Sequence, residues 1–265
     1  MEKYKLIALL TCYGNKDSVQ DNINNIKKFN DDVCIIINDG TPGGLEDLAS
    51  DGVYIVKRKP FLRDINNNPI VSTFEKFDTI IPLHIDLCDF ILENNLVSDH
   101  IVLLSSNQLF IDHGFSKLIT EYDASYYERD IDTGCIPPLL TNNIFTAYFN
   151  DLGMKNFKVQ SNHDGMFFKY DIFMNMIRYY EHFRNLKLFF HAEEFLYPAF
   201  LFKSVEPQRM VTFEKYNYWR PNWRFTEENI TVDDVKEGRK NGLLLVKRVP
   251  NDYNDDVRKY LREVN

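Results

Sequence analysis

The chain has 265 residues, of which 44% are hydrophobic and 26% charged, and its formal net charge at pH 7 is −8. This length and composition are typical of a globular protein with a full core, which we expect to form a single domain over residues 1–265. The acidic balance argues against nucleic acid or an anionic membrane surface as the main partner.

The first sixty residues alternate between short apolar runs and helical patterns. In chain order, the predicted elements are a strand over residues 4–11, a helix over 18–29, a strand over 33–37, a helical turn over 46–50 and a strand over 53–56. This order predicts the opening of a doubly wound α/β fold with a mostly parallel sheet flanked by helices. Because ligands of such sheets bind beyond the carboxyl ends of the strands, we expect ligand contacts at residues 12–16 and 38–41.

The rest of the chain predicts more helices than strands. The predicted elements are a helix within residues 74–94, a buried strand over 101–104, helices over 115–122, 167–184 and 193–202, and a closing helix from 231, strand over 243–249 and helix over 252–263. Residues 123–158 are rich in Asn, Asp, Gly and Pro, which predicts irregular structure.

The common nucleotide-binding and metal-binding motifs are missing from the sequence. It has no Gly-x-Gly-x-x-Gly after the first strand, no P-loop and no HExxH. Nucleotide-sugar glycosyltransferases often carry an Asp-x-Asp after a central strand, where it binds a divalent metal. Here the residues after the strand over 101–104 are Ser105, Ser106, Asn107 and Gln108. One such motif exists, Asp130-Ile131-Asp132, but it lies in the irregular region with no predicted strand before it, which favours a solvated loop.

Four segments in chain order carry a family resemblance: KLIALLTCYGN…VCIIINDG, HIVLLSSNQLFI, HAEEFLYPAF and ITVDDVKEGRKNGLLLVKRV. They resemble the opening strands, the segment ending Leu-Ser-Gly-x-Asp, the catalytic-base segment and the closing helix and basic strand of the core-2/I-branching N-acetylglucosaminyltransferase family (glycosyltransferase family 14). The chain departs from that pattern at Ser106, Gln108 and Glu193. The resemblance implies a GT-A-type fold, with a nucleotide-sugar-binding half over about residues 1–110 and an acceptor and catalytic half over about 111–265.

The resemblance also implies a mechanism, that of an inverting enzyme that uses neither a metal nor a cofactor. Glu194 matches the general base that takes the proton of the acceptor hydroxyl. Arg224, in the segment YWRPNWRF, and Lys247 match the two cations that neutralise the diphosphate of the donor. Without the resemblance, a carboxylate that stabilises the first turn of a helix is the favoured interpretation of Glu194. For Lys247 with Arg248 the alternative is a charge pair on an edge strand, and the diphosphate role of Lys247 is favoured over it.

Further candidates follow from their places in the chain. The donor candidates are Thr11, Tyr13, Asp39, Arg63 and Ser106, and the acceptor candidates are His163, Asp164, Trp219 and Trp223. Asp164 fits equally the N-cap of a following helix, and the tryptophans fit a loop anchored on the core.

The expected partners are a UDP-sugar donor, with GlcNAc and xylose as the favoured sugars, and a glycan or glycoconjugate acceptor. Two alternatives stay open: a metal-dependent glycosyltransferase that uses Asp130 and Asp132, and a carbohydrate-binding protein that lost the chemistry. We expect a cytoplasmic location, because the four cysteines form no CxxC pair and no run approaches the ~20 apolar residues of a membrane helix. The oligomeric state is left open by the sequence.

Overall fold

The structure is a computed structural model. It describes residues 2–12, 15–40, 44–57, 62–63, 69–70, 80–127, 129–130, 147, 150–152, 159–160, 163–185, 192–218 and 228–264. For residues 62–63, 69–70, 129–130, 159–160 and 185 only the backbone is described.

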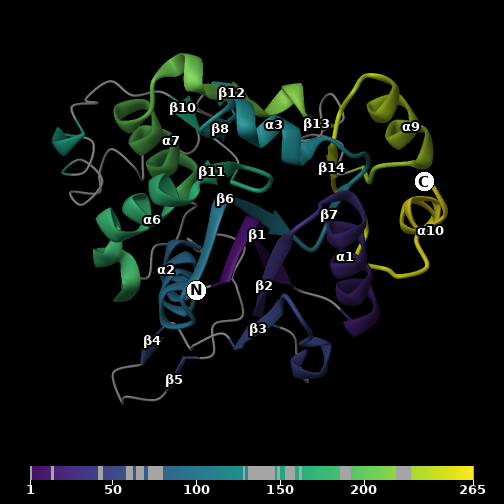
Figure 1. Ribbon diagram of the computed structural model, residues 1–265, viewed down its shortest axis with the longest axis horizontal. Helices are drawn as coiled ribbons and strands as arrows, with labels where there is room; N and C mark the ends of the chain where they lie inside the picture. The colour runs from purple at the N-terminus through teal and green to yellow at the C-terminus, as the bar shows by residue number, and fades with distance from the viewer. Residues whose placement is uncertain are drawn as a thin grey trace.

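A seven-stranded sheet lies at the centre of the protein (Figure 1), with the strand order β12-β8-β11-β6-β1-β2-β3. Its strands are β1 (Glu2–Cys12), β2 (Val33–Asp39), β3 (Val53–Lys57), β6 (Leu96–Ser105), β8 (Ala124–Tyr126), β11 (Phe167–Lys169) and β12 (Met210–Thr212). Within this sheet β11 alone is antiparallel to its neighbours. The predicted α/β class, a mostly parallel sheet flanked by helices, is confirmed.

Helices cover both faces of this sheet, with α2, α6 and α7 on one side and α1 on the other (Figure 1). The helices flanking it are α1 (Lys16–Phe29), α2 (Ile81–Glu93), α3 (Phe115–Glu121), α6 (Tyr170–Tyr179) and α7 (Glu193–Ser204). The start of α1 shows why the helix forms there, since the side chain of Asn15 accepts a hydrogen bond from Ser18 N. Asp17 in its first turn and Lys28 in its last turn both suit the helix dipole.

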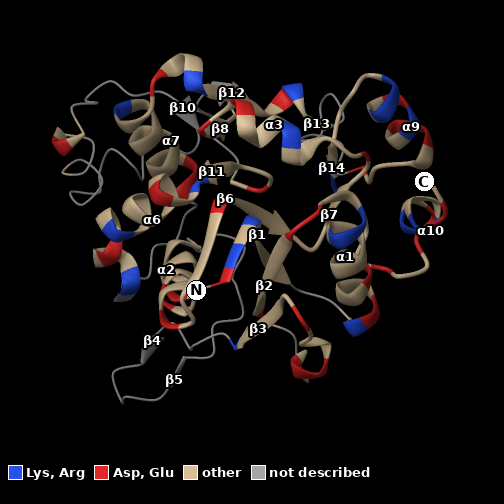
Figure 2. Ribbon diagram, viewed as in Figure 1, with Lys and Arg blue, Asp and Glu red and all other residues tan. Residues whose placement is uncertain are grey.

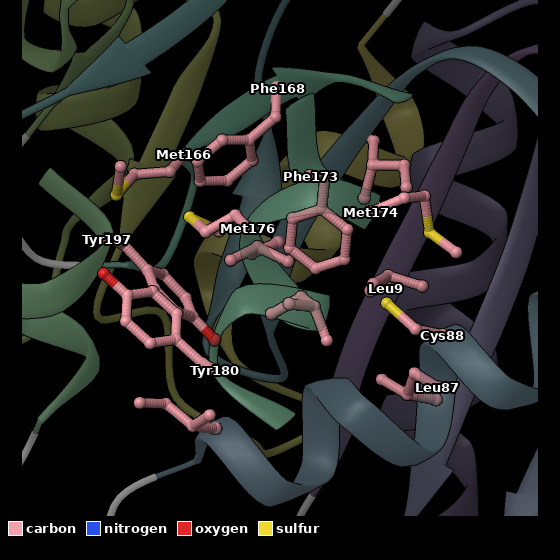
Figure 3. Close-up of a cluster of buried hydrophobic side chains, with 14 of the residues drawn as sticks. Leu9, Leu87, Cys88, Met166, Phe168, Phe173, Met174, Met176, Tyr180 and Tyr197 are labelled. Carbon is pink, nitrogen blue, oxygen red and sulfur yellow. The ribbon is translucent and has the colours of Figure 1, made fainter. Parts of the chain in front are cut away.

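The strands are apolar on both faces because each face packs against helices. Along β1, Ile7 and Leu9 belong to the core under α2, α6 and α7, whereas Leu6, Ala8 and Leu10 belong to the core under α1 and α3. Figure 3 shows part of the first core, including side chains from α2, α6 and α7 together with Leu9 of β1.

A smaller sheet continues from the end of β6. It has the order β13-β14-β7, with β13 (Asn217–Tyr218), β14 (Leu245–Lys247) and β7 (Gln108–Phe110). The helices α9 (Val232–Lys240) and α10 (Asp256–Glu263) pack on it through a third apolar cluster. Since β7 follows β6 after a two-residue turn, this sheet lies at the carboxyl edge of the central sheet.

The remaining elements are short. They are β4 (Leu62–Arg63) paired with β5 (Pro69–Ile70), β9 (Arg129–Asp130) paired with β10 (Val159–Gln160), and the 3-10 turns η1 (Glu46–Leu48), η2 (Glu181–Asn185), η3 (Pro207–Arg209) and η4 (Phe213–Lys215).

Two secondary-structure predictions were wrong. The region predicted as a helix over 167–184 begins with the strand β11. Phe167 and Phe168 are both apolar because they pack on opposite faces of the sheet, so the sequence shows no alternation of apolar and polar residues that would indicate a strand. The region predicted as irregular contains β8, so a strand does precede Asp130. The three-residue strands β8, β11 and β12 are too short for their periodicity to be visible.

Charged side chains are concentrated on the helices and at the strand ends, while the central parts of the strands are largely uncharged (Figure 2). None of the helices in the described ranges has the length and apolar character needed to cross a membrane.

Candidate functional site at the carboxyl edge of the sheet

The carboxyl ends of β1, β2 and β6 meet at a topological switch point. The chain passes from β1 to β2 on one side, and β6 adds on the other side, which is where open α/β sheets bind ligands. The register pairs Thr11 with Ser105 and Cys12 with Asp39, and Ser106 N donates to Thr11 O over 3.1 Å. The structure therefore brings the predicted donor residues Thr11, Asp39 and Ser106 to one edge.

Three other elements bring side chains to this edge. The loop before β11 lies here because β11 runs opposite to β6, and Gly165 N donates to Leu103 O over 2.6 Å. The first turn of α7, with Glu194, lies on this side because α7 precedes the parallel strand β12. In the smaller sheet, Lys247 pairs directly with Gln108.

Lys247 and Asp164 form an ion pair within this site. Their side chains are only 11% and 13% exposed. Burial lowers the pKa of the Lys247 ammonium to about 7, and the positive charge of Arg248 acts in the same direction. Arg248 has a φ of 75°, an unusual backbone conformation for a residue other than glycine. Lys247 therefore lies in a confined place and is not part of an exposed charge pair.

His163 connects this ion pair to a buried carboxylate. Its Nε2 lies 3.2 Å from Asp164 Oδ1, and its Nδ1 lies 3.6 Å from Glu193 Oε1. Glu193 is fully buried, and its Oε2 accepts a hydrogen bond of 3.2 Å from Ile80 N at the start of α2. The positive end of that helix favours a carboxylate there. Glu193 thus anchors α2 to α7, while its neighbour Glu194 is partly exposed.

A second contact between the same two helices joins His84 of α2 to Tyr197 of α7. His84 Nδ1 and the Tyr197 hydroxyl share a hydrogen bond of 2.6 Å. Burial lowers the pKa of His84 to about 3, and the nearby His163 adds to this effect. His84 is therefore neutral near pH 7. Burial raises the pKa of Tyr197 well above its usual value.

A buried arginine joins the carboxyl edge of the central sheet to helices α1 and α10. Arg258 of α10 is fully buried and donates to Ser106 O over 2.9 Å, as well as to Asp21 Oδ2 over 2.9 Å and Asn22 Oδ1 over 2.7 Å on α1. Asn251 Nδ2 donates to Ser106 Oγ over 2.9 Å. These contacts fix the turn between β6 and β7.

The predicted residues differ in how the structure places them. Asp39 Oδ2 accepts a hydrogen bond of 2.9 Å from Leu45 N, so this carboxylate also stabilises the segment after β2. The alternative that Asp164 caps a helix is wrong, because β11 follows it and α6 begins only at Tyr170. Tyr13, Trp219, Trp223, Arg224 and Asp132 lie outside the described residues, and of Arg63 and Asp130 only the backbone is described.

Several residues of this edge had no role predicted from the sequence. They are His84, Gln108, Glu193, Tyr197, Asn217 and Arg258. Gln108 and Glu193 stand out in the sequence only as departures from the family pattern, and the others carry no local signal. In the ranges that the structure covers, no group of three or more His, Cys, Asp or Glu side chains is placed to bind a metal ion.

No protein-family model and no curated protein matches this chain. It is similar to a crystal structure of an active-site mutant of LgtC, with 12% identity and a TM-score of 0.46 over 97% of this chain and 94% of that chain. It is also similar to the galactosyltransferase LgtC in complex with donor and acceptor sugar analogues, with 11% identity, a TM-score of 0.46 and the same coverage. We therefore base the function on the geometry of the site, and the core-2/I-branching resemblance stays a prediction.

Proposed function

We propose that this protein is a GT-A-type glycosyltransferase that moves a sugar from a UDP-sugar to a glycan hydroxyl. The observation that carries the proposal is the place of Lys247, a nearly buried lysine beside the end of β6 and the start of β7. A parallel sheet binds phosphorylated ligands at this edge. A confined ammonium there suits the diphosphate of a nucleotide sugar.

The diphosphate replaces Asp164 as the partner of Lys247 when the donor binds. Two phosphates carry the charge that develops as the sugar leaves, and fixed cations in a dry site stabilise that charge without a metal. Arg224 is the proposed second cation and provides a bidentate contact to phosphate.

Glu194 is the proposed general base. The acceptor hydroxyl oxygen attacks the anomeric carbon and forms the new C–O bond. The bond from that carbon to the UDP oxygen breaks, its electron pair leaves with UDP, and the hydroxyl proton passes to the Glu194 carboxylate. A single displacement inverts the anomeric centre. The partial exposure of Glu194 gives an acceptor access to it, whereas the buried Glu193 has a structural contact with α2.

The test begins with a thermal-shift and calorimetry screen of UDP, UDP-GlcNAc and UDP-xylose in EDTA and then in manganese. Transfer to candidate glycan acceptors is followed by NMR, which also reports the anomeric configuration of the product. We expect binding in EDTA and an inverted product. Activity that is lost in EDTA and restored by manganese would support the alternative with Asp130 and Asp132. Sugar binding without turnover on any acceptor would support the carbohydrate-binding alternative.

Glu194→Gln tests the base directly. We expect transfer to fall by at least ~100-fold while the affinity for the UDP-sugar is kept, because a general base acts in the chemical step. Glu206→Gln, at an exposed position after α7, is the matched control and should keep full activity. Unchanged turnover in Glu194→Gln would remove Glu194 from the mechanism.

A further inference from the structure

Two buried side-chain amides of the smaller sheet have no hydrogen-bond partner among the residues that the structure describes. Gln108 of β7 is 3% exposed and Asn217 of β13 is 4% exposed. Neither the oxygen nor the nitrogen of either amide is hydrogen-bonded to any part of the chain that the structure describes. Buried polar groups are almost always paired, so two neighbouring exceptions require a cause.

Both amides face Gly165. A Cβ atom added to Gly165 would clash with Gln108 Nε2 and would lie 2.7 Å from Asn217 Nδ2. Gly165 also has a φ of +88°, which a residue with a side chain rarely adopts. The backbone of Gly165 is already used, because its N donates to Leu103 O and its carbonyl accepts from the Tyr216 hydroxyl. Gly165 therefore offers no hydrogen bond to either amide, and both amides stay unpaired within the described ranges.

The amides share a face of the sheet with Lys247. Gln108 is paired directly with Lys247, and Asn217 is paired with Leu245, two residues before Lys247 on β14. Residues two apart on a strand, and residues paired across strands, project to the same side. Both amides and Lys247 therefore point toward the loop with Asp164 and Gly165, where the Lys247–Asp164 ion pair lies.

The chemistry of the two amides selects the ligand group. Each amide offers one accepting oxygen and two donating N–H bonds, and neither carries a charge. Two hydroxyl groups on adjacent carbons are a complementary partner, since each hydroxyl both donates and accepts. A phosphate would prefer the neighbouring ammonium.

We propose that Gln108 and Asn217 bind two neighbouring hydroxyls of the transferred sugar, beside the diphosphate at Lys247. This inference rests on the proposed function and adds the residues that select the sugar. The two amides are specificity-determining residues, and Gly165 is required for the close approach of both.

The experiment compares UDP with UDP-sugar binding in Gln108→Met and Asn217→Leu by calorimetry. UDP lacks the sugar, so its affinity should match that of the unaltered protein. The affinity for the UDP-sugar should fall by roughly 10-fold for each amide, which is the effect of one lost hydrogen bond to a ligand. The denaturation midpoints should stay equal or rise, because an unpaired buried polar group is replaced by an apolar one. Asn241→Leu, at an exposed position after α9, is the control and should change neither affinity.

The outcomes separate this inference from the proposed function. An unchanged preference for UDP-sugar over UDP, or a lower midpoint with full UDP-sugar affinity, would overturn the role of the amides. If one variant does not fold, the other decides. If the unaltered protein binds neither UDP nor a UDP-sugar, the proposed function fails, and saturation-transfer NMR with free GlcNAc and xylose tests the amides alone. A signal that is lost in the Gln108→Met variant would support the site, and no signal from the unaltered protein would overturn it.

Discussion

Two buried polar clusters of this protein differ in how completely they are hydrogen-bonded. Around Arg258, the guanidinium donates to the carbonyl of Pro250 over 2.7 Å, to Asp21, to Asn22 and to the carbonyl of Ser106. Around Gly165, the amides of Gln108 and Asn217 have no partner among the described residues. Both clusters lie near the turn between β6 and β7, yet only the first one is complete by itself.

The difference indicates that the Arg258 cluster stabilises the fold, whereas the amides of Gln108 and Asn217 are available to a ligand. A buried charge costs stability unless it is paired and hydrogen-bonded, so the Arg258 cluster joins α10, α1 and the sheet edge. A buried amide without a partner lowers stability and is expected where a ligand supplies the missing bonds. The two polar clusters are similarly buried, and they differ in whether their polar atoms are hydrogen-bonded.

The largest expected effect comes from breaking the complete cluster. Arg258→Met should lower the free energy of unfolding by about 3–5 kcal/mol, because it leaves the Asp21 carboxylate buried without this partner. Chemical denaturation measures the change. Arg262→Met is the matched control, since Arg262 binds the same carboxylate at 3.0 Å but is 30% exposed, and should cost less than about 1 kcal/mol. Equal losses in the two variants would contradict the distinction.

A smaller effect on the free energy of unfolding is expected when the pH is lowered, because His84 is buried in its neutral form. His84 has a pKa of about 3 in the folded chain and about 6.5 when unfolded. Between these pH values the unfolded chain binds more protons than the folded chain. The contribution of His84 to the free energy of unfolding is therefore fully present above pH 6.5 and is lost as the pH is lowered. From pH 7 to pH 5 the loss through this group should be about 2 kcal/mol.

His84→Gln should remove that part of the pH dependence, measured by denaturation at the two pH values. His182→Gln, at an exposed position in η2, should leave it unchanged. A pH dependence that is the same in His84→Gln and the unaltered protein would show that His84 is not held neutral.

The smallest effect is a proton taken up when the proposed UDP-sugar donor binds. The pKa of Lys247 is about 7 without a ligand, and a diphosphate beside it favours the charged form. At pH 7 about half a proton should therefore be bound with each UDP-sugar. Calorimetry in buffers of different ionisation enthalpy measures this number, and it should vanish in Lys247→Met. The same enthalpy in every buffer would contradict a lysine that is partly neutral in the free protein.

The sequence predicts the long elements of this fold and only part of the site. The runs that became β1, β2 and β6 are apolar over at least four residues, so their existence and their carboxyl ends were predictable, together with Thr11 and Asp39. The strands β8 and β11 have three residues each, and their pairing depends on partners far away in the chain. The Lys247–Asp164 and Arg258–Asp21 contacts likewise join residues that no local pattern relates.

The closing segment from β14 to α10 also bears on how the protein is synthesised. Arg258 reaches Asp21 across 237 positions of the chain, and Lys28 donates to the carbonyl of Leu261 across 233. Chains emerge from the ribosome with the N-terminal part first, so β1, β2 and β6 are available long before Lys247 and Arg258. The nascent chain can pair its central strands early, but its binding edge is completed only when the closing segment arrives. Completion of the proposed site is then coupled to the synthesis of this segment, and a chain interrupted before it would have the central strands without Lys247 and Arg258.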